Sequence, residues 1–211
     1  MEQKRKLLFV EGVNDREVVY RIENHYNLRD ICCVLKMDSD DGVSTALELH
    51  INEQASKTHS VGIVIDADLD FTARWTSIRN ILVRSNSYQV PLLLPENGLI
   101  LDSVLENHPR VGVWIMPNNR DSGMLEDFMR GLLHGNDSLI PEVDSVLSQI
   151  ESKGLQRYKQ VHKTKAWIHT FLAWQDEPGS SLALAVDKRI LDPSAKSAEL
   201  FAFWMKSLYC D

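Results

Sequence analysis

An apolar strand that runs straight into three alternating acids constrains this chain more than any other stretch. Residues 61–65 read Val-Gly-Ile-Val-Ile, and Asp66, Asp68 and Asp70 follow at every second position. A short, continuous apolar run of this kind is typical of a strand that is buried on both faces of a parallel sheet. Open α/β sheets bind their ligands where the chain leaves the carboxyl ends of such strands. We therefore expect Asp66 and Asp68 to lie at a ligand-binding edge.

Asp66 and Asp68 require a counter-charge if they lie side by side. Neighbouring carboxylates repel each other, and a hard divalent cation such as Mg²⁺ or Mn²⁺ takes oxygen ligands. The alternative interpretation is a solvated acidic turn after a strand. An isolated Asp-x-Asp motif does not decide between these two interpretations.

A second stretch near the amino terminus has the same pattern and favours the metal site. Residues 7–10 form a short apolar strand, Glu11 stands at its end, and Gly12 permits a tight exit. Asp15 follows four residues after Glu11, in the expected first turn of the next helix, where a carboxylate suits the helix dipole. Two strand ends of one sheet would then deliver acids to the same edge.

The order of the expected elements predicts a mainly parallel α/β sheet. Expected strands cover residues 7–10, 31–35, 61–65, 89–94, 98–101 and 111–116, of which 89–94 is an edge or interrupted strand because it contains and precedes prolines. Expected helices cover residues 15–26, 43–54, 71–84, 124–133, 141–152, 163–174 and 195–209. Alternating strands and helices are typical of a Rossmann-like sheet with right-handed crossovers. We predict an α/β core over residues 1–135 and a helical C-terminal part, residues 136–211, packed on it.

Other charged residues have two interpretations each. The acids of residues 38–42 could bind a metal, but a polar turn that caps the following helix is favoured. Glu126 and Asp127 fall in the first turn of a helix, where acids commonly compensate the dipole, although a strand end could also deliver Glu126 to the metal edge. Arg74, Arg79 and Arg84 could line a phosphate path, but solvated helix arginines are favoured.

Composition limits the classes of protein that this chain can represent. The 211 residues carry a net charge of −7, which argues against a protein that coats nucleic acid by charge alone. No apolar run approaches the ~20 residues of a membrane span, and the start does not have the pattern of a signal peptide. Three cysteines without a C-x-x-C spacing indicate neither a disulfide framework nor a zinc site. We expect a cytoplasmic protein.

Taken together, the two acidic motifs resemble the signature of the TOPRIM domain family. That signature has one Glu after the first strand and an Asp-x-Asp, often with a third acid, after a later strand. The resemblance covers about residues 5–130 and is nearest to the TOPRIM domains of OLD-like nucleases and to small stand-alone TOPRIM-like proteins of unassigned function. The stretches 114–117, 123–127 and 163–167 resemble the small proteins.

This resemblance implies a set of site residues and a chemistry. In OLD-like nucleases an acid follows the first Glu by four residues, a Leu-Glu after the sheet adds a ligand, and a lysine of the helical part faces the scissile phosphate. The expected metal ligands are therefore Glu11, Asp15, Asp66, Asp68, Asp70 and Glu126, with Asp70 in a supporting position. Glu11 is also a candidate general base, Lys165 is the expected catalytic lysine, and Lys163 is the second choice.

The resemblance predicts Mg²⁺- or Mn²⁺-dependent phosphodiester chemistry on DNA or RNA, with one or two ions. The net charge of the chain is more acidic than is typical of a nuclease that binds nucleic acid without a partner. A protein partner could therefore supply the contacts with nucleic acid. An oligomer is also possible. A non-catalytic TOPRIM-fold binding or assembly module is the main alternative. A phosphatase of the haloacid-dehalogenase type ranks third, because its Asp-x-Asp usually lies on the first strand and would not require Glu11.

Overall fold

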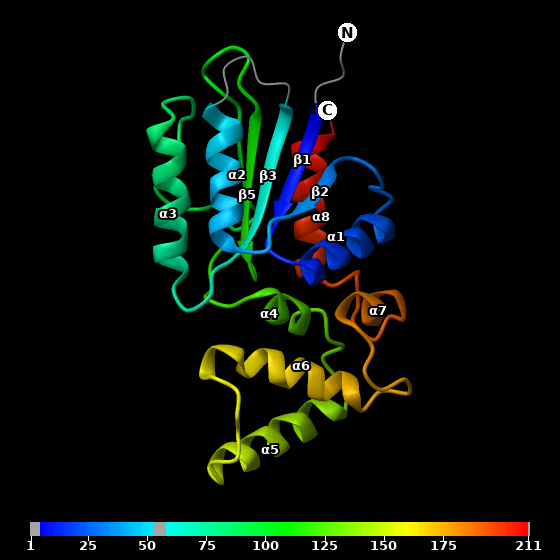
Figure 1. The fold of residues 1–211 in the computed structure, drawn as a ribbon. Coiled ribbons are helices and arrows are strands. Elements are labelled where there is room, and N and C mark those ends of the chain that lie inside the picture. The colour runs from blue at the N-terminus through cyan, green and yellow to red at the C-terminus, as the bar shows by residue number, and fades with distance from the viewer. Residues whose placement is uncertain (1–4, 53–57, 211) are drawn as a thin grey trace.

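A five-stranded sheet forms the centre of the computed structural model, which describes residues 5–52 and 58–210 (Figure 1). The strands are β1 (Arg5–Val10), β2 (Cys33–Lys36), β3 (Thr58–Asp66), β4 (Leu99–Leu101) and β5 (Arg110–Met116). Their order is β2-β1-β3-β5-β4, and all neighbours are parallel except β4, which pairs antiparallel with β5. The carboxyl ends of β1, β3 and β5 therefore meet at one edge of the sheet.

Helices cover both faces of the sheet and extend past its carboxyl edge. They are α1 (Val13–His25), α2 (Asp40–Asn52), α3 (Phe71–Arg84), α4 (Leu125–Arg130), α5 (Leu139–Ser152), α6 (Lys163–Ala173), α7 (Leu182–Asp187) and α8 (Lys196–Tyr209). One hydrophobic core joins α2 and α3 to one face, and a second joins α1 and α8 to the other. Helix α4 lies at the carboxyl edge, with α6 and then α5 beyond it (Figure 1).

The predicted fold class is confirmed: the structure is α/β, with a mostly parallel sheet flanked by helices and several helices in the C-terminal part. The prediction of a division at residue 135 stays a prediction, and α8 packs directly on the sheet while α5 and α6 form the outlying layer. The predicted end of the second helix at Gln54 lies outside the described residues.

The predicted strand over residues 89–94 is wrong, because this segment is irregular. Proline lacks the N–H that a strand ladder needs, so the prolines at 91 and 95 oppose pairing. The segment's carbonyls bond to helix α3 instead: Trp75 Nε1 donates to Leu92 O, and Arg79 Nε donates to Pro91 O. The short helix α7 was not predicted; it begins where Ser181 accepts a hydrogen bond from the Leu184 N–H.

Two paired glycines allow helix α8 to approach the sheet closely. Gly62 of β3 pairs with Gly112 of β5, and both lie beneath Leu208 of α8. A Cβ at position 112 would lie 2.3 Å from Leu208 Cδ2, and one at position 62 would lie 2.4 Å from the Tyr209 hydroxyl. Tyr209 in turn donates to the Leu7 carbonyl at 2.7 Å. The C-terminal helix thus closes one face of the sheet at the two positions that lack side chains.

Glu23 of helix α1 is buried, and its ionisation opposes folding. Its side chain is 3% exposed, and burial is the main cause that raises its pKa from 4.5 to about 7; the neighbouring Asp30 adds to the shift. The Cys32 thiol donates to Glu23 at 3.7 Å, and the charge of Glu23 adds to burial in raising the pKa of the Tyr209 hydroxyl. The folded chain therefore binds more protons than the unfolded chain between pH 4.5 and about 7.

We expect the free energy of unfolding to fall by about 2 kcal/mol as the pH rises through this window. The Glu23→Gln variant keeps the shape and a hydrogen-bond acceptor but cannot ionise, so its stability should change less between pH 5 and 7.5. Urea titrations of both proteins at several pH values measure this difference. Equal pH profiles for the two proteins would contradict the assignment.

Over the described residues, the helices are all too short or too polar to cross a membrane.

Candidate metal centre

The ends of β1 and β3 are tied together by Glu11. Glu11 directly follows β1, and its Oε1 accepts a hydrogen bond from the Asp66 backbone N–H at 2.8 Å. Asp66 is the last residue of β3, and its Oδ1 accepts from the Leu125 N–H, the first residue of α4, at 3.0 Å. Each carboxylate therefore has one oxygen engaged by the backbone. The described residues provide no hydrogen bond to the second oxygen of either group.

Two buried acids from helices complete the cluster. Asp15 lies in the first turn of α1, where its Oδ2 accepts from the Gly12 N–H at 3.2 Å and its exposed fraction is 9%. Glu126 lies in the first turn of α4 and is 3% exposed. Carboxylates are seldom buried to this degree without a cation. The structure thus places these four acids around one cavity, and their predicted role as metal ligands stays a prediction.

Lys165 of α6 contacts this cluster from the helical layer. Its Nζ lies 2.9 Å from Glu126 Oε1, and its side chain remains 45% exposed. A cavity of about 380 Å³ is bounded by Lys165 and the four acids, together with part of the turn that precedes α2 and the start of α4. The second lysine considered from the sequence, Lys163, pairs with Glu151 at 2.7 Å and does not line this cavity.

Burial and mutual repulsion raise the pKa values of Glu11, Asp15 and Asp66. Burial raises the pKa of Glu11 to about 7, with Asp15 adding repulsion. Burial first, and then the charges of Glu11, Asp15 and Glu126, raise the pKa of Asp66 to about 9. The pKa of Asp15 is also raised, mainly by burial. One lysine does not compensate four carboxylates, so without a cation the raised pKa values keep Asp66, and about half of Glu11, protonated at neutral pH.

The carboxylates of Asp68 and Asp70 bond to other groups of the protein and do not line the cavity. Asp68 has a positive φ of 54°, and its carboxylate pairs with Arg74 Nη2 at 2.6 Å. Arg74 Nη1 pairs with Asp40 at 2.7 Å. Asp70 is the N-cap of α3 and accepts from the Ala73 N–H at 2.9 Å. Neither side chain lines the cavity, although the charge of Asp68 still contributes to the raised pKa of Asp66. Their predicted role as ligands stays a prediction.

The donor set fits a hard divalent cation in its chemistry. As the side chains stand, residues 5–52 and 58–210 contain no group of three or more His, Cys, Asp or Glu side chains disposed to hold a metal ion. In this arrangement Lys165 forms an ion pair with Glu126, and the charges of the neighbouring acids oppose ionisation of Asp66. The second oxygens of Glu11 and Asp66 accept no hydrogen bond from the described residues, and both residues line the cavity, so these oxygens are available to an ion there.

Three features of the site were not predicted from the sequence. The N–H of Leu125 orients Asp66, and Arg74 joins Asp68 to Asp40. The turn before α2 does cap that helix, since Ser39 Oγ accepts from the Gly42 N–H at 3.0 Å, and it also forms one wall of the cavity. The acid-rich composition of this turn was the sequence signal that could have placed it beside the carboxylate cavity. The two other features depend on contacts between distant segments.

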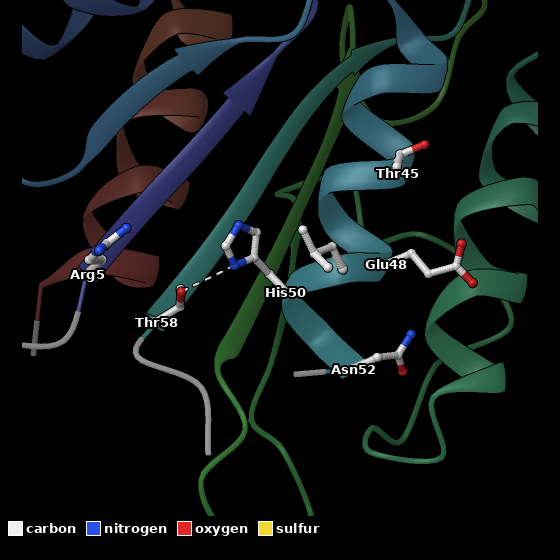
Figure 2. A pocket seen from close by; sticks show the side chains of 7 residues that line it. Arg5, Thr45, Glu48, His50, Asn52 and Thr58 are labelled. Atoms are coloured by element: carbon white, nitrogen blue, oxygen red, sulfur yellow. Dashed lines mark hydrogen bonds between the residues drawn. The ribbon is translucent and has the colours of Figure 1, made fainter. Parts of the chain in front are cut away.

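A larger cavity lies at the opposite end of the sheet, where β1 and β3 begin (Figure 2). Its volume is about 700 Å³, and His50 joins Thr58 there by a hydrogen bond of 3.3 Å. Among its described lining residues the only acid is Glu48, which points toward α3 and pairs with Arg84 at 3.2 Å. This cavity lacks a converging set of acids, so the carboxylate cavity is the better candidate for chemistry.

A family model described as "Protein of unknown function (DUF3226)" matches residues 5–210. No curated protein and no solved structure matches the chain significantly.

Proposed function

Because this chain belongs to the DUF3226 family, whose description names no activity, we propose a function from the site itself: divalent-metal-dependent hydrolysis of phosphodiester bonds in nucleic acid. The observation that carries the proposal is the convergence of Glu11, Asp15, Asp66 and Glu126 with Lys165 in one cavity at the carboxyl edge of the sheet. The resemblance of the two acidic motifs to TOPRIM domains favours a phosphodiester over a phosphomonoester substrate.

The four carboxylates would hold Mg²⁺ or Mn²⁺ by the oxygens that face the cavity. Such ions supply Lewis-acid activation of water and stabilisation of the leaving oxygen. Glu11 and Asp66 are oriented for this role by the backbone N–H groups of Asp66 and Leu125, which fix one oxygen of each. Preorganised ligands of this kind hold their geometry because the strand and helix ends that position them are part of the core.

Lys165 and Glu11 would act on the substrate itself. The Lys165 ammonium is half-exposed at the rim of the cavity, where it can stabilise negative charge that develops on a phosphate. Glu11 has a pKa raised to about 7, mainly by burial, which suits a group that takes a proton near neutral pH. Asp68 and Asp70 lie farther along the same loop and support its conformation through Arg74 and the α3 N-terminus.

The Lys165→Gln variant tests this assignment because its two expected effects have opposite signs. Removing the ammonium frees Glu126, so Mn²⁺ affinity should increase severalfold. The same change removes charge stabilisation from the transition state, so turnover should fall by ~10²-fold. Calorimetry with Mn²⁺ and cleavage of labelled single-stranded DNA and RNA, with bis(p-nitrophenyl) phosphate as a small substrate, measure the two effects.

Lys163→Gln is the matched control, since it removes the same charge from the same helix but breaks only the pair with Glu151. We expect its turnover of bis(p-nitrophenyl) phosphate to stay within about threefold of the wild type. Absence of Mn²⁺-dependent cleavage of any of these substrates by the wild-type protein would overturn the proposed activity. If Mn²⁺ binding persisted in that case, the non-catalytic binding module would be favoured instead.

A further inference from the structure

An acid-free basic stretch follows helix α5 in a chain that is otherwise acidic. Residues 152–175 contain no Asp or Glu, whereas the whole chain has 30 acids and a net charge of −7. The basic residues of this stretch are Lys153, Arg157, Lys159, Lys163 and Lys165. We define residues 153–165 as the basic segment. Its charge is local, so the net charge of the chain does not describe this surface.

Three cations of the basic segment lack an intramolecular role. Lys163 and Lys165 pair with Glu151 and Glu126, respectively. Lys153, Arg157 and Lys159 are exposed, and none of them forms an ion pair or side-chain hydrogen bond with the described residues. Three exposed cations on a connecting segment repel each other and add nothing to the stability of the fold. These three cations are therefore available to form ion pairs with an anionic partner outside the chain.

The basic segment lies beside the carboxylate cavity. Its Val161 contributes to a cavity of about 460 Å³ whose other walls are the loop after β3 and the first turns of α3, including Asp68 and Arg74. Its last residue, Lys165, lines the carboxylate cavity. The segment therefore passes both cavities at the carboxyl edge, and in Figure 1 it rises from α5 to the start of α6 below the loop that follows β3.

We propose that the basic segment binds the phosphate backbone of a single nucleic-acid strand and directs it into the carboxylate cavity. This inference rests on the proposed function, which it extends from the chemistry of the site to the means by which the substrate is held. A polyanion fits this segment because the three unpaired cations are spread over residues 153–159, and the residues that follow, Val161 and Lys165, line the two cavities at the carboxyl edge. Binding by the basic segment would also mean that no protein partner is needed to hold the nucleic acid.

Binding in EDTA tests this surface without the metal chemistry. Fluorescence anisotropy is measured with a fluorescein-labelled 25-mer of single-stranded DNA and the same sequence in RNA, for the wild type and the triple variant Lys153→Gln/Arg157→Gln/Lys159→Gln. We expect the triple variant to bind ~10-fold or more weakly, and the slope of log K against log salt to decrease by about 2, as expected for three lost phosphate contacts.

A second triple variant, Arg29→Gln/Arg84→Gln/Lys206→Gln, removes the same charge from exposed positions near the opposite end of the sheet. Its affinity should stay within about twofold of the wild type. Equal losses in both triple variants, no loss in either, or binding of the segment to phosphatidylserine vesicles without binding to DNA or RNA would overturn the proposal.

Failure of the proposed function gives a different result. In that case Mn²⁺ would not bind and bis(p-nitrophenyl) phosphate would not be cleaved, but the loss of nucleic-acid binding in the first triple variant would remain. If the basic segment alone were wrong, cleavage of the small substrate would persist and both triple variants would bind nucleic acid like the wild type.

Discussion

The Asp66→Asn variant is expected to be more thermally stable than the wild type without metal and to lose the response to Mn²⁺. Asp66 has a pKa raised to about 9, first by burial and then by Glu11, Asp15 and Glu126, so its folded form resists ionisation. An acid with a raised folded pKa reduces stability as the pH rises from its unfolded pKa, near 4, to its folded pKa. At pH 8 most of this loss in the free energy of unfolding is present in the metal-free wild type.

Asparagine retains the oxygen that accepts from the Leu125 N–H and removes the charge. We expect a gain of about 2 kcal/mol at pH 8, which corresponds to a rise in Tm of ~4–8 °C for a chain of this size. Saturating Mn²⁺ should raise the Tm of the wild type, because the ion binds only the folded carboxylate cluster. The Tm of the variant should not change, because the variant lacks the Asp66 carboxylate. Differential scanning calorimetry with EDTA and with Mn²⁺ measures both changes.

Asp176→Asn is the matched control, since it makes the same chemical change at an exposed loop position without a described side-chain partner. Its Tm should stay close to that of the wild type in EDTA, and its response to Mn²⁺ should be complete. A decrease in the metal-free Tm of Asp66→Asn, or an Mn²⁺ response equal to that of the wild type, would contradict the metal centre.

The Gly62→Ala variant is expected to lower the free energy of unfolding by about 3 kcal/mol. The added Cβ would lie 2.4 Å from the Tyr209 hydroxyl and 2.9 Å from both Leu208 and Leu8, all within the packed core. Tyr209 would have to move, and its buried hydrogen bond to the Leu7 carbonyl would break. The corresponding decrease in Tm is ~6–12 °C.

A double-mutant cycle with Tyr209→Phe tests the cause of this loss. Phenylalanine removes the hydroxyl that the new Cβ meets, at the cost of the hydrogen bond to Leu7. If the contact is the reason, the double variant should lose at least 1 kcal/mol less than the sum of the single variants. Strict additivity in urea titrations would show that Gly62 acts through another contact, for example with Leu208.

Local patterns predicted most of the fold because they are properties of short segments. Apolar strands followed by amphipathic helices indicated the parallel sheet, and the ends of helices such as α3 and α5 were predicted closely. The segment at 89–94 failed because its apolar content resembles a strand, whereas its bonding is decided by Trp75 and Arg79 of α3. Helix α7 was missed because six residues give too little periodicity.

The sequence by itself determined which acids stand at strand and helix ends, because that depends only on their position after an apolar run. The tertiary structure decided how those acids are used. Pairing of β1 with β3 brings Glu11 to the Asp66 N–H, and the position of α4 brings Glu126 to the same cavity, whereas Arg74 turns Asp68 away from it. These choices depend on contacts between segments more than 50 residues apart as well as within one loop, and no local pattern encodes them.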